Sequence, residues 1–167
     1  LCFPENFAFL GRSFQESLNM SEPLDGPLFT RYRELCAKNR VWGSFGGFQE
    51  RPSQFPPNFT PAVDPETGRK FTLKDYLYNA HVVVDDSGNI HSVYRKIHLY
   101  DVDYPQVFHE SLHTLPGDEI VVADTPFGKI CLSVCYDLRF PELYLALRKK
   151  GADIILAPAA FTQRTGI

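Results

Sequence analysis

The chain has 167 residues, of which 44% are hydrophobic and 22% charged, with a formal net charge of −3. These values are typical of one ordinary globular domain over residues 1–167, and the slight negative charge argues against nucleic acid as a partner. The sequence has no run of about 18 apolar residues, so we expect no membrane partner.

The first half of the sequence predicts a strand, a helix, a second strand and a long loop. The first strand ends at Phe3, before a turn at Pro4-Glu5-Asn6. A helix follows, with Asp25 as its N-cap, Pro27 in its first turn, and a buried side at helical spacing formed by Leu28, Tyr32, Leu35 and Cys36. The second strand covers 41–48. Residues 52–75 contain five prolines and predict a surface insertion loop.

The second half predicts strands around one helix. The elements are a hairpin of 76–84 and 90–96, an irregular stretch over 98–118, a strand pair of 119–124 and 129–135, a helix over 141–150 closed by Gly151, and a strand over 153–158. The last strand pair, helix and strand form a strand-helix-strand unit. Such a unit implies a parallel pair of strands that is buried on both faces.

The four cysteines are expected to be free thiols. Cys2, Cys36, Cys131 and Cys135 show neither metal-site spacing nor the spacing of a small secreted disulfide framework. Cys131 and Cys135 share a predicted strand, which separates their Cα atoms by roughly 13 Å, too far for a disulfide. Free thiols are typical of a reducing compartment. We therefore expect a cytoplasmic protein, or a mitochondrial or plastid one if a transit peptide precedes Leu1.

Cys135 is the first candidate for chemistry. An apolar, strand-like segment ends at this cysteine, a turn with Asp137 and Arg139 follows, and Pro141 stands at a plausible helix start. A thiol at such an elbow lies near backbone N–H groups, which favour a lowered thiol pKa and can stabilise an oxyanion.

A nucleophilic thiol also needs a base or a cation beside it. None of the five histidines, at positions 81, 91, 98, 109 and 113, has the spacing of a Cys–His pair, so we expect them to be solvated or satisfied in the core. Glu5 follows the end of the first predicted strand and Lys96 closes the second hairpin strand, and strand ends converge on the crevice where α/β proteins place their sites. The carboxylate could accept the thiol proton and the lysine could hold an oxyanion.

Three segments now point to a family. Phe3-Pro4-Glu5, Tyr94-Arg95-Lys96-Ile97-His98-Leu99 and Cys135-Tyr136-Asp137-Leu138-Arg139-Phe140-Pro141-Glu142 resemble, in order, the three catalytic motifs of the nitrilase superfamily of carbon–nitrogen hydrolases. The resemblance implies an α/β fold, a four-layer α-β-β-α sandwich. It also implies that this chain is an incomplete fragment, lacking an N-terminal strand and helix and a C-terminal part. No metal and no organic cofactor are implied.

The resemblance implies a Glu-Lys-Cys triad. Cys135 would be the nucleophile that forms a thioester, Glu5 the general base and acid, and Lys96 the group that stabilises the oxyanion. The backbone N–H of Tyr136 would share the oxyanion, and its ring would line the pocket. Glu110 matches the family's second glutamate, which supports the lysine and the substrate.

Three further residues correspond to substrate-binding positions. Arg139 could clamp a substrate carboxylate bidentately, or could instead form a structural salt bridge to Asp137 or Glu142. Phe161 and Thr162 match a segment that lines the pocket in relatives. Asp137 is expected to fix the elbow rather than to touch substrate.

Within the superfamily, the chain is most similar to the deaminated glutathione amidase branch. The supporting segments are Ser21–Gly26, Gly46–Arg51, Tyr78–His81 and Phe140–Leu143. The ω-amidase branch matches the first two less well, and the 52–75 loop departs from both. The resemblance implies an amidase that releases ammonia from a small carboxylate-bearing amide, deaminated glutathione being the best candidate, in metabolite repair.

Several alternatives remain at this point. Other enzyme activities would be ω-amidase action on 2-oxoglutaramate or 2-oxosuccinamate, or N-carbamoyl hydrolysis. A different class would be a truncated, non-catalytic paralogue that binds a partner or ligand. The resemblance further implies a homodimer or higher oligomer, packed through the helix over 141–150.

Overall fold

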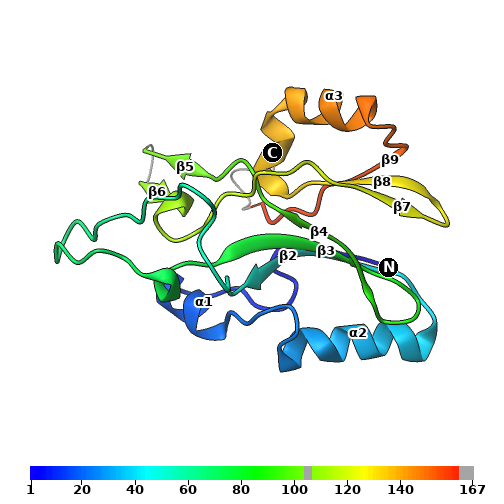
Figure 1. The fold of residues 1–167 in the computed structure, drawn as a ribbon, viewed down its shortest axis with the longest axis horizontal. Helices are drawn as coiled ribbons and strands as arrows, with labels where there is room; N and C mark the ends of the chain where they lie inside the picture. The colour runs from blue at the N-terminus through cyan, green and yellow to red at the C-terminus, as the bar shows by residue number, and fades with distance from the viewer. Residues whose placement is uncertain (104–106, 162–167) are drawn as a thin grey trace.

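A computed structural model describes residues 1–103 and 107–161, which form four layers in the order α-β-β-α (Figure 1). The first helical layer holds α1 (Phe14–Met20) and α2 (Pro27–Asn39), and the last holds α3 (Pro141–Lys149). Two sheets lie between these layers. The expected four-layer sandwich is therefore confirmed.

The first sheet has the strand order β1-β2-β3-β4. Its strands are β1 (Cys2–Phe3), β2 (Gly43–Glu50), β3 (Tyr78–Val84) and β4 (Ile90–Arg95). Strand β1 is parallel to β2, and the other pairs are antiparallel. The β3–β4 pair is the predicted hairpin.

The second sheet has the order β7-β8-β9, with β7 (Val122–Thr125), β8 (Gly128–Leu132) and β9 (Ile154–Leu156). A small ribbon of β5 (Asp101–Val102) and β6 (Phe108–His109) interrupts the stretch predicted to be irregular. Short 3₁₀ turns occupy Leu73–Asp75 (η1), Glu110–Leu112 (η2) and Cys135–Arg139 (η3).

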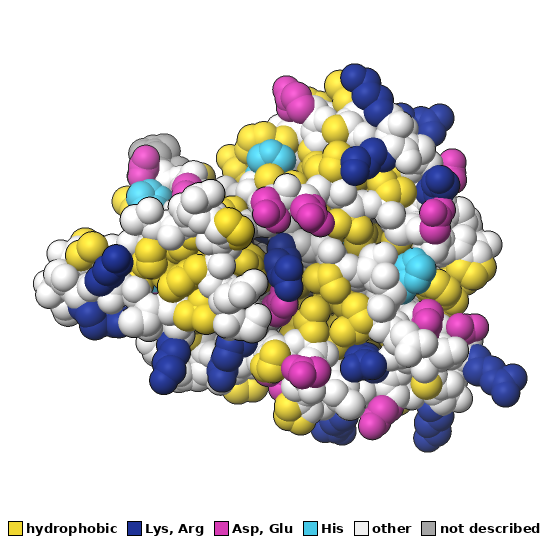
Figure 2. Space-filling view, viewed as in Figure 1, with side chains coloured by type: hydrophobic (Ala, Val, Ile, Leu, Met, Phe, Trp, Pro, Cys, Tyr) yellow, Lys and Arg dark blue, Asp and Glu magenta, His cyan; other side chains and the backbone are white. Residues whose placement is uncertain are grey.

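Each interface between layers has its own apolar cluster. Helix α2 packs on the first sheet through Phe29, Cys36, Phe45, Phe48, Ala80, Val82 and Val84. The two sheets pack on each other through Val83, Tyr94, Leu132 and Val134. The second sheet packs on α3 through Cys131, Leu143, Leu147 and Ala152. Strand β3 contributes alternate residues to the first two clusters, because successive side chains of a strand point to opposite faces. Figure 2 shows hydrophobic side chains reaching the surface between the helical layers, with acidic and basic side chains both at the centre of this face and around its edge.

Helix α2 begins differently from the prediction. Its N-cap is Gly26, which gives no side-chain bond, and the carboxylate of Glu22 instead accepts the N–H of Phe29 at 2.6 Å. Asp25 was therefore wrong as the N-cap. Of the predicted buried side, Cys36 is buried and Leu28 and Tyr32 pack partly buried against the same cluster, whereas Leu35 is exposed and Phe29, which was not predicted, is buried.

The parallel pairing of β8 with β9 is confirmed, but its burial on both faces is not. Ile155 is 58% exposed and Ile154 lies at the surface, because helix α3 covers the cluster around Cys131 and Leu147 rather than β9.

The 52–75 segment is a loop, as predicted, but some of its side chains are packed in a hydrophobic cluster. Phe55 and Phe59 pack around Tyr76, together with Phe71 and Leu115, to form a fourth apolar cluster. Helix α1 was not predicted at all. Its signal was the pattern Ser13-x-x-Glu16: the Ser13 hydroxyl accepts the N–H of Glu16.

The four cysteines are free, as expected. Among the described residues, no helix combines the length and apolar character needed to cross a bilayer.

Candidate functional site

A cavity of about 460 Å³ opens between the sheets and brings together residues from across the chain. Seven of the eight residues singled out in the sequence line it: Glu5, Lys96, Glu110, Cys135, Tyr136, Arg139 and Phe161. Thr162 lies outside the described residues. A cavity of this size suits a small-molecule ligand.

Glu5 reaches the cavity because strand β2 has a bulge next to it. The register of β2 shifts between Phe45 and Phe48, and Gly47 within this bulge has φ +65°. A Cβ at Gly47 would lie 2.5 Å from Cγ of Glu5, so only glycine allows this approach. The Glu5 carboxylate is buried and accepts the Ala160 N–H at 3.0 Å.

Lys96 lies between two carboxylates and is 2% exposed. Its Nζ is 2.8 Å from Oε2 of Glu110 and 3.8 Å from Oε1 of Glu5. Burial lowers the pKa of Lys96, but the charge and hydrogen bond of Glu110, the charge of Glu5 and the nearby Cys135 outweigh it, so the pKa is raised. The lysine is therefore a fixed cation in the cavity.

Asn79 connects the two carboxylates and was not predicted as a site residue. Its Nδ2 donates to Oε1 of Glu5 at 2.9 Å and to Oε1 of Glu110 at 3.3 Å. Asn79 follows Tyr78 on β3, and the Lys96 N–H donates to the Asn79 carbonyl at 2.9 Å. One amide side chain thus orients both acids around Lys96.

Cys135 occupies a strained elbow. It begins η3 with φ +45°, a conformation that residues other than glycine rarely adopt, and its N–H donates to the Pro158 carbonyl at 2.8 Å. Such outliers are held in place by the surrounding structure and cluster at functional sites.

The pKa of the Cys135 thiol is raised to about 11, opposite to the lowering expected from the sequence. Burial is the largest cause, and the charge and hydrogen bonding of Glu5 add to it, while the Ala160 N–H and Lys96 lower it. The elbow's backbone N–H groups do not overcome burial beside a carboxylate. The resting group is therefore a thiol that must lose its proton to react.

Asp137 holds the elbow from behind, as expected. It is fully buried, and its carboxylate accepts hydrogen bonds from the Tyr94 hydroxyl at 2.7 Å and the Val134 N–H at 2.8 Å. Nδ1 of His98 lies 2.7 Å from the same carboxylate, and the His98 ring stacks on Phe140 at 3.7 Å. The elbow is thus anchored to the first sheet.

Arg139 and Phe161 stand at the exposed side of the cavity. Among the described residues no ion pair links Arg139 to Asp137 or Glu142, so that structural alternative is not realised. Arg12, just before α1, lines the same cavity and adds a second guanidinium that sequence reasoning missed. A ligand in this cavity meets two arginines.

His81 is satisfied in the core, as expected, and joins the two sheets. Its ring is fully buried, with Nδ1 3.0 Å from the Ser133 carbonyl and Nε2 2.7 Å from the Ser44 hydroxyl. Because a carbonyl only accepts, Nδ1 carries the proton and Nε2 accepts from Ser44. Burial, partly offset by the Ser133 bond, lowers the pKa of His81 to about 4.

This shift predicts a loss of stability in mild acid. The unfolded histidine, with its ordinary pKa of 6.5, binds a proton as the pH falls from 6.5 to 4, whereas the folded one does not. The free energy of unfolding should fall by about 3 kcal/mol over this window from His81 alone. Urea titrations at several pH values should show a shallower dependence in His81→Gln than in the exposed control His91→Gln. Equal slopes would contradict the assignment.

Among residues 1–103 and 107–161, no group of three or more His, Cys, Asp or Glu side chains is placed to hold a metal ion. The acids of the cavity are instead occupied with Lys96, Asn79 and backbone N–H groups.

Comparison with known proteins identifies the family. Residues 1–166 match the family model "Carbon-nitrogen hydrolase". The chain is 41% identical to the deaminated glutathione amidase of Dictyostelium discoideum, over 99% of this chain and 53% of that protein, and 40% identical to the human one, over 98% and 46%. The C. elegans NitFhit crystal structure superposes with a TM-score of 0.78 at 34% identity, over 99% of this chain and 36% of that one. The chain thus spans about half the length of the curated relatives it matches, and it belongs to the carbon–nitrogen hydrolase family.

Proposed function

We propose that the protein is an amidase that uses Cys135 as nucleophile, Glu5 as general base and acid, and Lys96 as the cation that stabilises the oxyanion. The observation that carries this proposal is the convergence of a half-buried thiol, a buried carboxylate and a buried ammonium in one cavity, with the carboxylates of Glu5 and Glu110 both oriented by Asn79. The family membership and the names of the relatives support it.

The raised pKa of Cys135 gives Glu5 its role. Glu5 accepts the thiol proton while Sγ attacks the amide carbonyl carbon, and the tetrahedral oxyanion is held by Lys96 and the backbone N–H of Tyr136. Tyr136 lies in the first turn of η3, where N–H groups have no acceptor within the turn. Glu110 keeps Lys96 charged through its 2.8 Å contact.

The intermediate then collapses. The C–N bond breaks, Glu5 returns its proton to the leaving nitrogen, and ammonia departs from a thioester on Cys135. Glu5 next takes a proton from water as the water oxygen attacks the thioester carbonyl. The C–S bond breaks and Glu5 gives the proton taken from water to the departing thiolate of Cys135, which leaves the carboxylic acid product and the original enzyme.

Two arginines favour a carboxylate-bearing amide as substrate. Arg139 and Arg12 line the cavity, and a guanidinium binds a carboxylate through two parallel hydrogen bonds. Deaminated glutathione fits this chemistry and is the substrate in the names of the relatives, so we propose it, in metabolite repair. Short 2-oxo amides, the ω-amidase substrates, and N-carbamoyl acids are the competitors.

The test is ammonia release by the full-length protein on these three substrate classes, measured side by side. The proposal expects the highest kcat/KM for deaminated glutathione, and a selective rise in KM, not a fall in kcat, for Arg139→Gln. Higher kcat/KM for 2-oxoglutaramate would reassign the substrate. Absence of release from every amide, in a protein that melts cooperatively, would favour a non-catalytic binding paralogue.

We further propose a cytoplasmic homodimer or higher oligomer that packs through α3. The support is the exposure of Leu145 (63%) on α3 and of Leu138 (45%) just before it. Native mass spectrometry of wild type and Leu145→Glu should show loss of the oligomer in the variant.

A further inference from the structure

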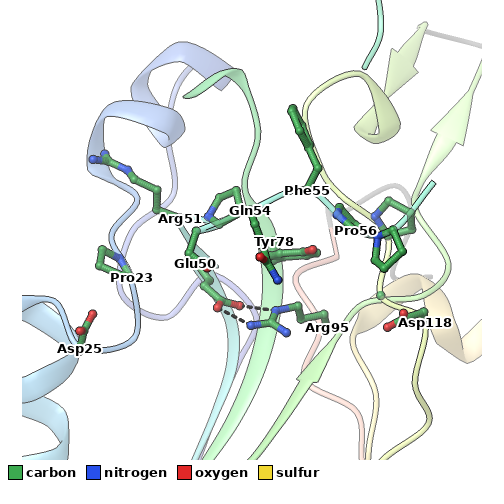
Figure 3. A pocket seen from close by; sticks show the side chains of 15 residues that line it. Pro23, Asp25, Glu50, Arg51, Gln54, Phe55, Pro56, Tyr78, Arg95 and Asp118 are labelled. Atoms are coloured by element: carbon green, nitrogen blue, oxygen red, sulfur yellow. Dashed lines mark hydrogen bonds and ion pairs between the residues drawn. The ribbon is translucent and has the colours of Figure 1, made fainter. Parts of the chain in front are cut away.

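At three strand ends of the first sheet, the side chains on one face line the site cavity and the side chains on the other face line a second cavity. Gln49, Asn79 and Lys96 line the site cavity, whereas their chain neighbours Glu50, Tyr78 and Arg95 line a separate cavity of about 440 Å³. Successive strand residues point to opposite faces, so each pair straddles the sheet. Figure 3 shows the second cavity, with Glu50, Arg95 and Tyr78 at its centre.

Glu50 and Arg95 form a bidentate ion pair in this second cavity. Nε of Arg95 donates to Oε2 of Glu50 at 2.7 Å and Nη2 donates to Oε1 at 2.6 Å. The Glu50 side chain is 8% exposed. Both bonds are charge-assisted and share one plane, so they fix the direction of the arginine as well as its distance.

The pair reaches across a strand. Glu50 ends β2 and Arg95 ends β4, and β3 lies between these strands in the sheet. The guanidinium carbon of Arg95 sits 4.6 Å from the centre of the Tyr78 ring on β3, so the ring fills the gap that the pair spans. The ion pair and the contact of the guanidinium with the ring thus connect β2, β3 and β4 to one another.

Lys96 lies next to this ion pair, at the point where the regular hydrogen bonding of β4 ends. Strand β4 ends at Arg95, so Lys96 lies just past the regular ladder. Beyond the Lys96 N–H bond to Asn79, the Lys96 carbonyl accepts the Gly117 N–H at 2.9 Å, and Gly117 packs so closely on Arg95 that a Cβ would lie 2.1 Å from the Arg95 carbonyl oxygen. The position of Arg95 thus determines that of the Lys96 backbone.

We propose that Arg95 and Glu50 are positioning residues, which set the location of the Lys96 ammonium from the reverse face of the sheet. For the role of the lysine this inference rests on the proposed function. Neither residue lines the site cavity, so neither touches substrate. A displacement of about 1 Å in such a group can cost on the order of 100-fold in rate.

The test compares Arg95→Met and Glu50→Gln with a matched control. Arg69→Met breaks the other bidentate pair of this chain's described residues, Arg69–Asp75, with bonds of 2.9 and 2.7 Å, which lines neither cavity. The first readout needs no amide substrate: the rate of Cys135 alkylation by iodoacetamide against pH, followed by mass spectrometry of the peptide that holds Cys135. Thermal melts establish that each variant is folded.

Because Lys96 lowers the pKa of Cys135, Arg95→Met should move the alkylation midpoint to higher pH and slow labelling at fixed pH by about threefold to tenfold. The second readout is amide hydrolysis, where kcat should fall by about 10- to 100-fold with KM nearly unchanged. Glu50→Gln should lower the labelling rate and kcat in the same way. The double variant Glu50→Gln/Arg95→Met should lower them no further than either single variant, because both remove the same ion pair. Arg95→Lys should restore part of the lost labelling rate and kcat.

The outcomes separate the two proposals. If Arg95→Met labels and turns over like Arg69→Met while wild type hydrolyses amides, the positioning role is overturned and the amidase stands. If wild type releases no ammonia but labelling slows as expected, the positioning role stands and the amidase falls. If Arg69→Met lowers the labelling rate and kcat as much as Arg95→Met does, in step with its loss of thermal stability, then Arg95 is a purely structural residue.

Discussion

Cys135→Ala should lower ammonia release by about 10⁴-fold or more, because the proposed thioester cannot form without the thiol and little remains when a covalent nucleophile is removed. The elbow should survive, since alanine is smaller and faces the same backbone conformation as cysteine at φ +45°. The measurement is single-turnover and steady-state ammonia release, with circular dichroism as a check on folding.

Cys2→Ala is the matched control, because Cys2 is an exposed thiol outside the cavity. It should keep full activity. Retained activity in Cys135→Ala would remove the thiol from the mechanism and leave the family's fold without the chemistry proposed here.

Glu5→Gln should have two effects of opposite sign. Hydrolysis should fall by about 10²- to 10⁴-fold, because no base takes the thiol proton and no acid serves the leaving nitrogen. Alkylation of Cys135 by iodoacetamide should instead speed up at a fixed pH below 11, because the charge of Glu5 is one of the causes that raise the pKa of the thiol.

Glu66→Gln, an exposed glutamate in the 52–75 loop, is the control and should change neither rate. A parallel fall of both rates in Glu5→Gln would mean that Glu5 acts mainly by shaping the cavity. An unchanged hydrolysis rate would remove it from proton transfer altogether.

The sequence was informative wherever a residue type and its local context were enough. The hairpin that presents Lys96 and the turn after Cys135 could both be predicted, because apolar alternation and a proline at a helix start are local signals. The burial of Glu5 could not, since it depends on the bulge at Gly47, which lies 42 positions away and shows only as a glycine within a strand.

Long-range surroundings explain the remaining errors. The thiol pKa of Cys135 is set by burial and by Glu5, neither of which the elbow itself reveals. Asn79 lay in the segment Tyr78–His81 that resembles the branch, but only the fold shows that its amide meets two acids from different segments. Arg12 was missed because α1 was not predicted.

The hydrogen bond from Ala160 to Glu5 joins residues 155 positions apart, near the two ends of the described chain. Closing such a long loop is entropically costly and belongs among the late events of folding. Strands β2, β3 and β4 of the first sheet can pair earlier, from contacts much closer in sequence. The thiol and its proposed base are therefore held together only after this long-range contact has formed, so reactivity at Cys135 would report on that contact rather than on the formation of the first sheet.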